Sequence, residues 1–122
     1  MGISNLNKGS RFKFSYNKDQ VEYLNTKQYI DKFGLDTVMI IRACHINRNG
    51  KYGPQATAIV TQTNDGPIYG VNLPAHMVDL VEIILDTKDY IDDIDNLRAG
   101  LQAKEYIDKD GVKRYSFTFL DL

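Results

Sequence analysis

The pattern of apolar and polar positions predicts three strands, a helix and then two further strands. Segment 37–46 is rich in β-branched residues and nearly continuously apolar, which is typical of a strand covered on both faces. The other predicted strands are 55–62, 67–73, 101–107 and 113–120. Gly70, inside the third strand, indicates a bulge or a bend.

Apolar residues at helical spacing predict the helix between the third and fourth strands. It spans 74–85 and has Pro74 in its first turn. Its apolar face is expected to comprise Met77, Leu80, Val81, Ile84 and Leu85. A short acidic turn or helix is expected at 88–97. A further helix at 27–33, capped by Asn25 or Thr26 and ended by Gly34, is expected to close one mouth of a barrel.

The turns between the strands favour hairpins. They contain Asn49-Gly50, Asp65-Gly66 and Asp110-Gly111, whose residues tolerate the positive φ of tight turns. Strand, strand, strand, helix, strand, strand is the order of an OB-fold, a small five-stranded barrel. We therefore predict an all-β domain with one or two helices: a single OB-fold domain over 1–122, with the barrel over 35–122.

Residues 1–34 are predicted to form an N-terminal extension of this barrel. Within it, 11–16 alternate basic and aromatic residues, the pattern of an exposed edge strand. Such a strand is a ready interface, and we expect a homodimer or a higher homo-oligomer.

Composition indicates a single globular domain of 122 residues. The first residues lack the apolar run of a signal peptide, and no stretch is long and apolar enough for a membrane span. Cys44, the one cysteine, suits a reducing cytosol and is expected to be a buried structural thiol. We expect a soluble, cytoplasmic protein.

The net charge of −1 conceals an asymmetry between the two halves of the chain. Residues 1–64 carry nine Lys and Arg against four acidic residues, whereas 65–122 carry six against twelve. Cations regroup in the acidic half at Lys109, Lys113 and Arg114. Because clustered cations rather than a basic total make a phosphate-binding surface, the choice lies between such a surface and an ordinary patchy exterior.

Catalytic motifs are weak. His45 and His76 are expected to be structural or surface residues, and the sequence lacks a phosphate-binding loop and a nucleophile elbow. The acids at 92–95 are better explained as a solvated helix face than as a nuclease site. We predict no enzymatic activity, no cofactor and no metal.

Binding features are stronger, since recognition of single strands combines cations for phosphates with aromatic rings for bases. The first and last hairpins of an OB-fold flank its binding face, so their basic and tyrosine side chains are the candidates. Two further candidates lie on neighbouring strands. The predicted DNA-binding residues are Arg42, Arg48, Lys51, Tyr52, Tyr69, Lys109, Lys113, Arg114 and Tyr115.

Four segments resemble the small single-stranded DNA-binding proteins of lactococcal phages. They are 23–27, 32–38, 71–76 and 113–116, and the similarity extends by pattern over 20–122. The resemblance implies an OB-fold without enzymatic activity that coats single-stranded DNA during phage replication or recombination, with little sequence specificity. It also implies a location in the host cytoplasm and contact with replication or recombination proteins.

Two other functions fit the same residues. OB barrels also serve as protein-interaction or assembly modules that do not bind DNA, because fold does not fix function. A nuclease is the third interpretation, and it is the weakest because the acids lack partner residues.

Overall fold

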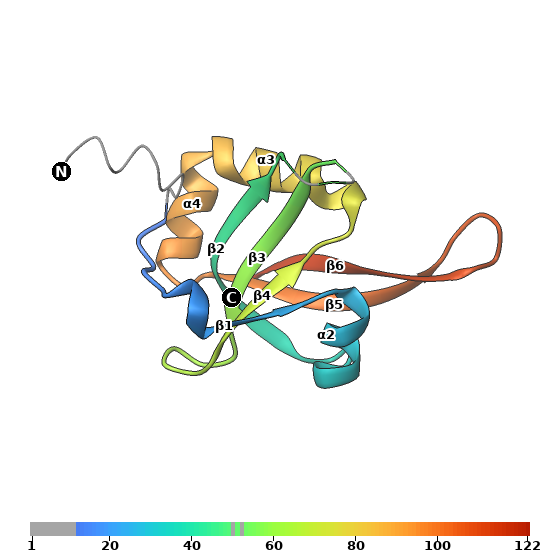
Figure 1. Cartoon of the computed structure of the whole chain (residues 1–122), viewed down its shortest axis with the longest axis horizontal. Helices are drawn as coiled ribbons and strands as arrows, with labels where there is room; N and C mark the ends of the chain where they lie inside the picture. Colours follow the sequence, from blue (N-terminus) through green and yellow to red (C-terminus); the bar gives the residue numbers. More distant parts are fainter. Residues whose placement is uncertain (1–11, 50, 52) are drawn as a thin grey trace.

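The computed structural model describes residues 12–49, 51 and 53–122. Six strands form one sheet: β1 (Val21–Leu24), β2 (Val38–Asn47), β3 (Gln55–Thr61), β4 (Ile68–Asn72), β5 (Ala99–Ile107) and β6 (Lys113–Asp121). The helices of the described part are α2 (Thr26–Phe33), α3 (Val78–Asp86) and α4 (Lys88–Asp95), with 3-10 turns η1 (Lys18–Gln20) and η2 (Ala75–Met77). Figure 1 shows α3 lying across one end of the sheet, while the β5–β6 hairpin projects from the body.

The sheet is mixed and open, with strand order β1-β4-β3-β2-β5-β6. β2, β3 and β4 form an antiparallel meander, β5 pairs with β2, and β6 pairs with β5. β1 adds a parallel pairing to β4. The five predicted strands therefore all form, to within a residue or two at each end, and the β-rich class is confirmed. The sixth strand, β1, was not predicted.

α2 begins with the predicted cap. The N–H of Gln28 donates to Oδ1 of Asn25 at 2.8 Å, and the N–H of Asn25 donates back to Oε1 of Gln28 at 2.9 Å. Gly34 ends the helix with a φ of +76°, in the left-handed region that favours glycine. The prediction of this helix is confirmed, one residue longer at its start.

The α2 helix packs its aromatic side chains between two strands that do not neighbour each other in the sheet. The Tyr29 ring lies edge-on to Phe117 of β6 at 5.2 Å between centroids, and the Phe33 ring lies edge-on to Tyr69 of β4 at 5.0 Å. Side chains of α2 thus connect β4 and β6 by ring packing.

The predicted helix at 74–85 is confirmed as η2 followed by α3. Its packing differs from the prediction at Leu80, which is 47% exposed rather than buried. Val81 and Ile84 are buried and set the direction in which α3 faces the core. Leu80 therefore lies on the flank of α3, next to α4. The short acidic helix expected at 88–97 is confirmed as α4.

The bulge lies in β2 rather than at Gly70. Gly70 keeps regular pairing, and a Cβ there would lie 2.6 Å from Cδ1 of the Tyr23 ring, so glycine is required by close approach. In β2 the register shifts between Ile41 and Ala43, which makes Arg42 the extra residue.

The predicted edge strand at 11–16 is wrong for residues 12–16, which form no strand, while residue 11 lies outside the described residues. Phe12 is buried, and Phe14 and Tyr16 pack against the core. The aromatic side chains of this segment are thus used for packing onto the sheet instead of alternating along an exposed edge.

One face of the central strands, here called the Val60 face, is covered by helices. Residues paired across an antiparallel ladder point to the same side, so Ile41, Val60 and Tyr69 share this face. Ile41 lies with Ile84 of α3 around a common cavity, and Tyr69 contacts Phe33 of α2. The Val60 face is the helix-covered side of the sheet.

The opposite face, here called the Thr61 face, is covered by residues 12–20. Along β3 it carries Thr57, Ile59 and Thr61, all buried. The Arg42 guanidinium lies 4.1 Å from the centre of the Phe14 ring, and the charge of Lys18 acts on His45, which is paired with Thr57. β3 is buried on both faces because helices lie on one side and this segment on the other.

Candidate nucleic-acid interface

The predicted DNA-binding residues fall in three separate places. Arg48 and Lys51 lie at the turn after β2, and Arg42 and Tyr69 lie within the sheet. The remaining described candidates are on the β5–β6 hairpin: Lys109, Lys113, Arg114 and Tyr115. Tyr52 lies outside the described residues. In Figure 1 the turn after β2 lies beside α3, whereas the hairpin tip extends away from it.

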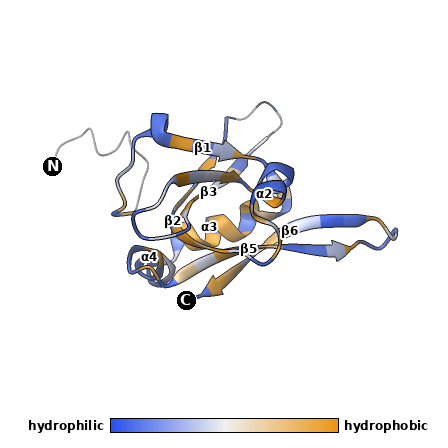
Figure 2. Cartoon of the chain, turned by 90° about the horizontal axis from the view of Figure 1, so that it is seen from below, coloured by the Kyte–Doolittle hydropathy of each residue, from blue (hydrophilic) through white to orange (hydrophobic). Residues whose placement is uncertain are grey.

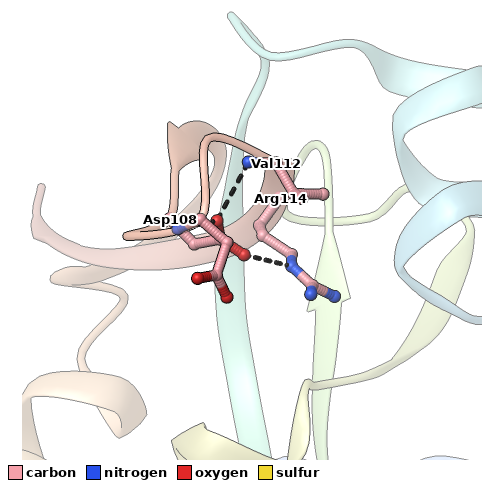
Figure 3. Close-up of polar contacts among 4 residues, drawn as sticks. Asp108, Val112 and Arg114 are labelled. Atoms are coloured by element: carbon pink, nitrogen blue, oxygen red, sulfur yellow. Dashed lines mark hydrogen bonds and ion pairs between the residues drawn. The ribbon is translucent and has the colours of Figure 1, made fainter.

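Acidic neighbours pair with two cations of the hairpin, Lys113 and Arg114. Nε of Arg114 donates to Oδ2 of Asp108 at 2.9 Å (Figure 3). Nζ of Lys113 lies 3.3 Å from Oε1 of Glu105. The hydrogen bond from Arg114, followed by that from the Val112 N–H, lowers the pKa of Asp108. A phosphate group at this hairpin would therefore compete with these carboxylates.

Arg48 is also paired. Its Nη2 lies 2.7 Å from Oε1 of Glu82, which connects the turn after β2 to α3. Both side chains are partly exposed, and an ion pair of this kind contributes little to stability. Any phosphate group that approached Arg48 would thus compete with Glu82 for it.

Arg42 and Tyr69 are both half-buried and have protein partners. Nη1 of Arg42 donates to the Asn64 carbonyl oxygen at 3.0 Å and to Oγ1 of Thr61 at 3.4 Å. Tyr69 belongs to the Val60 face, where Nζ of Lys32 lies 5.6 Å from its ring centre. Arg42 faces the side of the sheet covered by 12–20, and Tyr69 faces the side covered by α2.

Sequence reasoning missed an aromatic strip on the Thr61 face, made of Phe14, Tyr16 and Tyr23 with Arg42 at one end. The Phe14 and Tyr16 rings are stacked, with centroids 5.8 Å apart and planes 23° apart. Burial and then the nearby Tyr23 phenol raise the pKa of Tyr16. Tyr23 lies against Gly70 and is 44% exposed. The alternation of basic and aromatic residues at 11–16 was the available signal.

The strip has the chemistry of a platform for bases. Partly exposed aromatic rings stack on bases of any sequence, and a guanidinium over a ring adds a cation–π contact. A cavity of about 260 Å³ opens beside it, lined by Lys13, Phe14, Ser15, Arg42, Ile94 and Asp95. The Lys13 N–H donates to Oδ1 of Asp95 at 2.9 Å, which fixes the segment to α4.

His45 is a half-buried titratable group near this segment. Burial, and then the charge of Lys18, lower the pKa of His45 below its ordinary 6.5. The unfolded chain therefore takes up a proton at a higher pH than the folded chain. The contribution of neutral His45 to the free energy of unfolding is complete above about pH 6.5. It is lost as the pH falls toward the pKa of His45 in the folded chain.

We expect the free energy of unfolding, measured with urea, to be smaller at about pH 5.5 than at about pH 7.5. His45→Asn should reduce this difference, because it removes the group that titrates. His76→Asn is the control, because it removes the other histidine, whose Nε2 lies 2.8 Å from Oγ of Ser116. It should leave the pH dependence that is due to His45 in place. An unchanged pH dependence in His45→Asn would contradict the assignment.

Cys44 is buried, as predicted, and burial raises the pKa of its thiol to about 12. The thiol is therefore protonated at neutral pH.

Among residues 12–49, 51 and 53–122, no group of three or more His, Cys, Asp and Glu side chains is placed to hold a metal ion. No helix in the same ranges has the length and apolar character to span a membrane.

Comparison with protein-family models, curated proteins and solved structures gave no match to this chain. The features of the chain itself that bear on function are the aromatic strip, the cations at the two turns and the order of the strands.

Proposed function

We propose that this protein is a non-catalytic single-stranded DNA-binding protein of the kind found in lactococcal phages. It coats exposed strands, with little sequence specificity, during replication or recombination in the host cytoplasm. The observation that carries the proposal is the aromatic strip of Phe14, Tyr16 and Tyr23, which lies partly exposed beside Arg42 on one face of the sheet.

The order of strand pairing supports an OB-type barrel as the fold behind this function. β2 pairs with β3 and β5, β3 with β4, and β5 with β6, which are pairings that an OB-fold uses. Aromatic packing by α2 brings side chains of β4 and β6 together, while the outer edge of β4 is paired with β1. In this proposal the turn after β2 and the β5–β6 hairpin are the two loops beside the binding face.

Bases would stack on the strip while phosphates contact the cations of the two loops. Stacking is tolerant of sequence because every base has a π-face, and cations add affinity that depends on salt. Arg48, Lys51, Lys109, Lys113 and Arg114 supply the charge in this proposal. The carboxylate partners of Arg48, Lys113 and Arg114 give way to phosphate when DNA arrives, since exposed ion pairs are weak.

The salt dependence of oligonucleotide binding tests the proposal. The double variant Lys51→Gln and Arg114→Gln should weaken binding to all sequences alike. It should reduce the log–log salt slope by about 0.7 for each phosphate that the variant no longer neutralises, because each neutralised phosphate releases bound counterions. Titration of a labelled oligonucleotide at several salt concentrations measures both effects.

Asp108→Asn should tighten binding, because it frees Arg114 from its ion pair.

Lys88→Gln is the control, since Lys88 is an exposed lysine on α4 and belongs to neither loop. A slope in the double variant equal to that of the control would place the phosphate contacts elsewhere. No salt-dependent binding in the unaltered protein would favour an interaction module instead. Cleavage of the oligonucleotide with added metal would favour a nuclease.

We further propose a homodimer or higher homo-oligomer. The sheet of the described residues ends in two edge strands, and nine-residue β6 offers a longer free edge than four-residue β1. A monomer mass by light scattering at micromolar concentration would exclude this assembly.

A further inference from the structure

An apolar groove lies between α3, α4 and the end of β6, on a different part of the surface from the aromatic strip. It encloses about 410 Å³, and its apolar lining includes Leu80, Ile83, Tyr90, Phe119 and Leu120. Ile83 is 52% exposed and Tyr90 is 48% exposed. Figure 2 shows the apolar end of β6 near α4. Large apolar side chains gathered in a hollow mark an interaction site more than isolated ones do.

Carboxylates surround this groove. Residues 78–95, which form α3 and α4, contain seven acidic residues and one lysine. Asp121 and Asp93 line the cavity directly, and Asp93 is paired with Arg98, whose Nη2 lies 3.3 Å from its Oδ1. Asp79 and Asp86 are exposed and lie about one helical turn from Ile83, so they flank it on the surface of α3. The groove therefore has an apolar floor and a negative rim.

We propose that this groove binds a basic, amphipathic helical segment of a partner protein. Apolar side chains at helical spacing would fill the floor, and Lys or Arg side chains would meet the carboxylates of the rim. Phosphate groups are repelled by the same rim, so nucleic acid is a poor occupant. A second copy placed symmetrically would bring two negative rims together, which is also unfavourable. This inference is independent of DNA binding.

The test uses the full chain and a labelled synthetic peptide with Leu at helical spacing and Lys on the flanking positions. Fluorescence anisotropy should show binding that weakens severalfold as salt rises from about 50 to about 200 mM, because the charges become screened. The same peptide with Glu in place of Lys should bind at least about tenfold more weakly.

Variants of the groove locate the binding site. Leu80→Asn with Ile83→Asn should weaken peptide binding by about tenfold or more, because the floor then offers polar amides to the apolar side chains of the peptide. Asp79→Asn with Asp86→Asn should weaken it severalfold and flatten its salt dependence. Ile107→Asn is the matched control, since Ile107 is 62% exposed on the β5–β6 hairpin. Thermal melting checks that each variant remains folded.

Three results would overturn the proposal: no binding of the lysine peptide, equal binding of the lysine and glutamate peptides, or equal affinity of the groove variants and the Ile107→Asn control. A dimer in light scattering that Ile83→Asn dissociates would make a second copy the occupant and would also overturn it. Oligonucleotide titration of the same variants separates the two functions. If neither the unaltered chain nor any variant binds DNA, the proposed function is rejected, whereas the result for peptide binding stands.

Discussion

Tyr23→Ala is expected to weaken binding of single-stranded DNA about fivefold to 150-fold while the protein stays folded. The reason is that one base–aromatic stack is worth roughly 1–3 kcal/mol. The Tyr23 ring lies over Gly70 and is open to solvent on its other side, so its removal leaves little buried space. Tyr16→Ala should lower affinity as well, with a larger loss of stability because Tyr16 is more buried. Oligonucleotide titration and thermal melting of the same variants measure the two effects.

Tyr90→Ala is the matched control, because Tyr90 is a tyrosine of similar exposure on α4, beside the apolar groove. Its DNA affinity should equal that of the unaltered protein. Tyr23→Phe should keep most of the affinity, since the ring rather than the hydroxyl stacks. If Tyr23→Ala binds normally and Tyr69→Ala or Tyr115→Ala does not, the platform lies at the residues predicted from sequence.

Tyr29→Phe is expected to raise the free energy of unfolding by about 1 kcal/mol, whereas Tyr29→Ala should lower it by about 3–5 kcal/mol. The Tyr29 side chain is completely buried, and its hydroxyl has no hydrogen-bond partner among the described residues. Burial raises the pKa of this phenol to about 12, so the hydroxyl is neutral at physiological pH. Phenylalanine removes an unsatisfied polar group and keeps the ring contacts with Phe33 and Phe117.

Urea unfolding at neutral pH measures both changes. Tyr90→Phe is the control, because a phenol at the surface is hydrated and its loss should change stability by no more than about 0.5 kcal/mol. A loss of stability in Tyr29→Phe would mean that the hydroxyl is satisfied by a water molecule inside the protein.

The strands that were predictable from sequence are those specified locally. The hairpin turn at 108–111 and the apolar runs on either side of it determine β5 and β6 with little help from the rest of the chain. β1 is different, because Val21–Leu24 is short and gains its partner only through a parallel pairing with β4, a strand far along the chain. Local pattern carries no signal for such a pairing.

The candidate site shows the same division. Composition located the cations, and the turn at 108–111 would also have predicted that Lys113 comes near Glu105 across the hairpin. The Arg48–Glu82 pair and the contact of Arg42 with Phe14 join segments whose proximity depends on the tertiary fold. The aromatic strip was therefore missed even though its residues stood out in the sequence.

Helix α4 lies between the two proposed binding surfaces. Asp95 accepts the Lys13 N–H beside the aromatic strip, Tyr90 lines the apolar groove, and Ile94 contributes to the wall of both cavities. A displacement of α4 would therefore change the lining of both cavities. Thermodynamic linkage then sets a strict condition: any factor by which a bound partner changes the affinity for single-stranded DNA is the factor by which bound DNA changes the affinity for that partner.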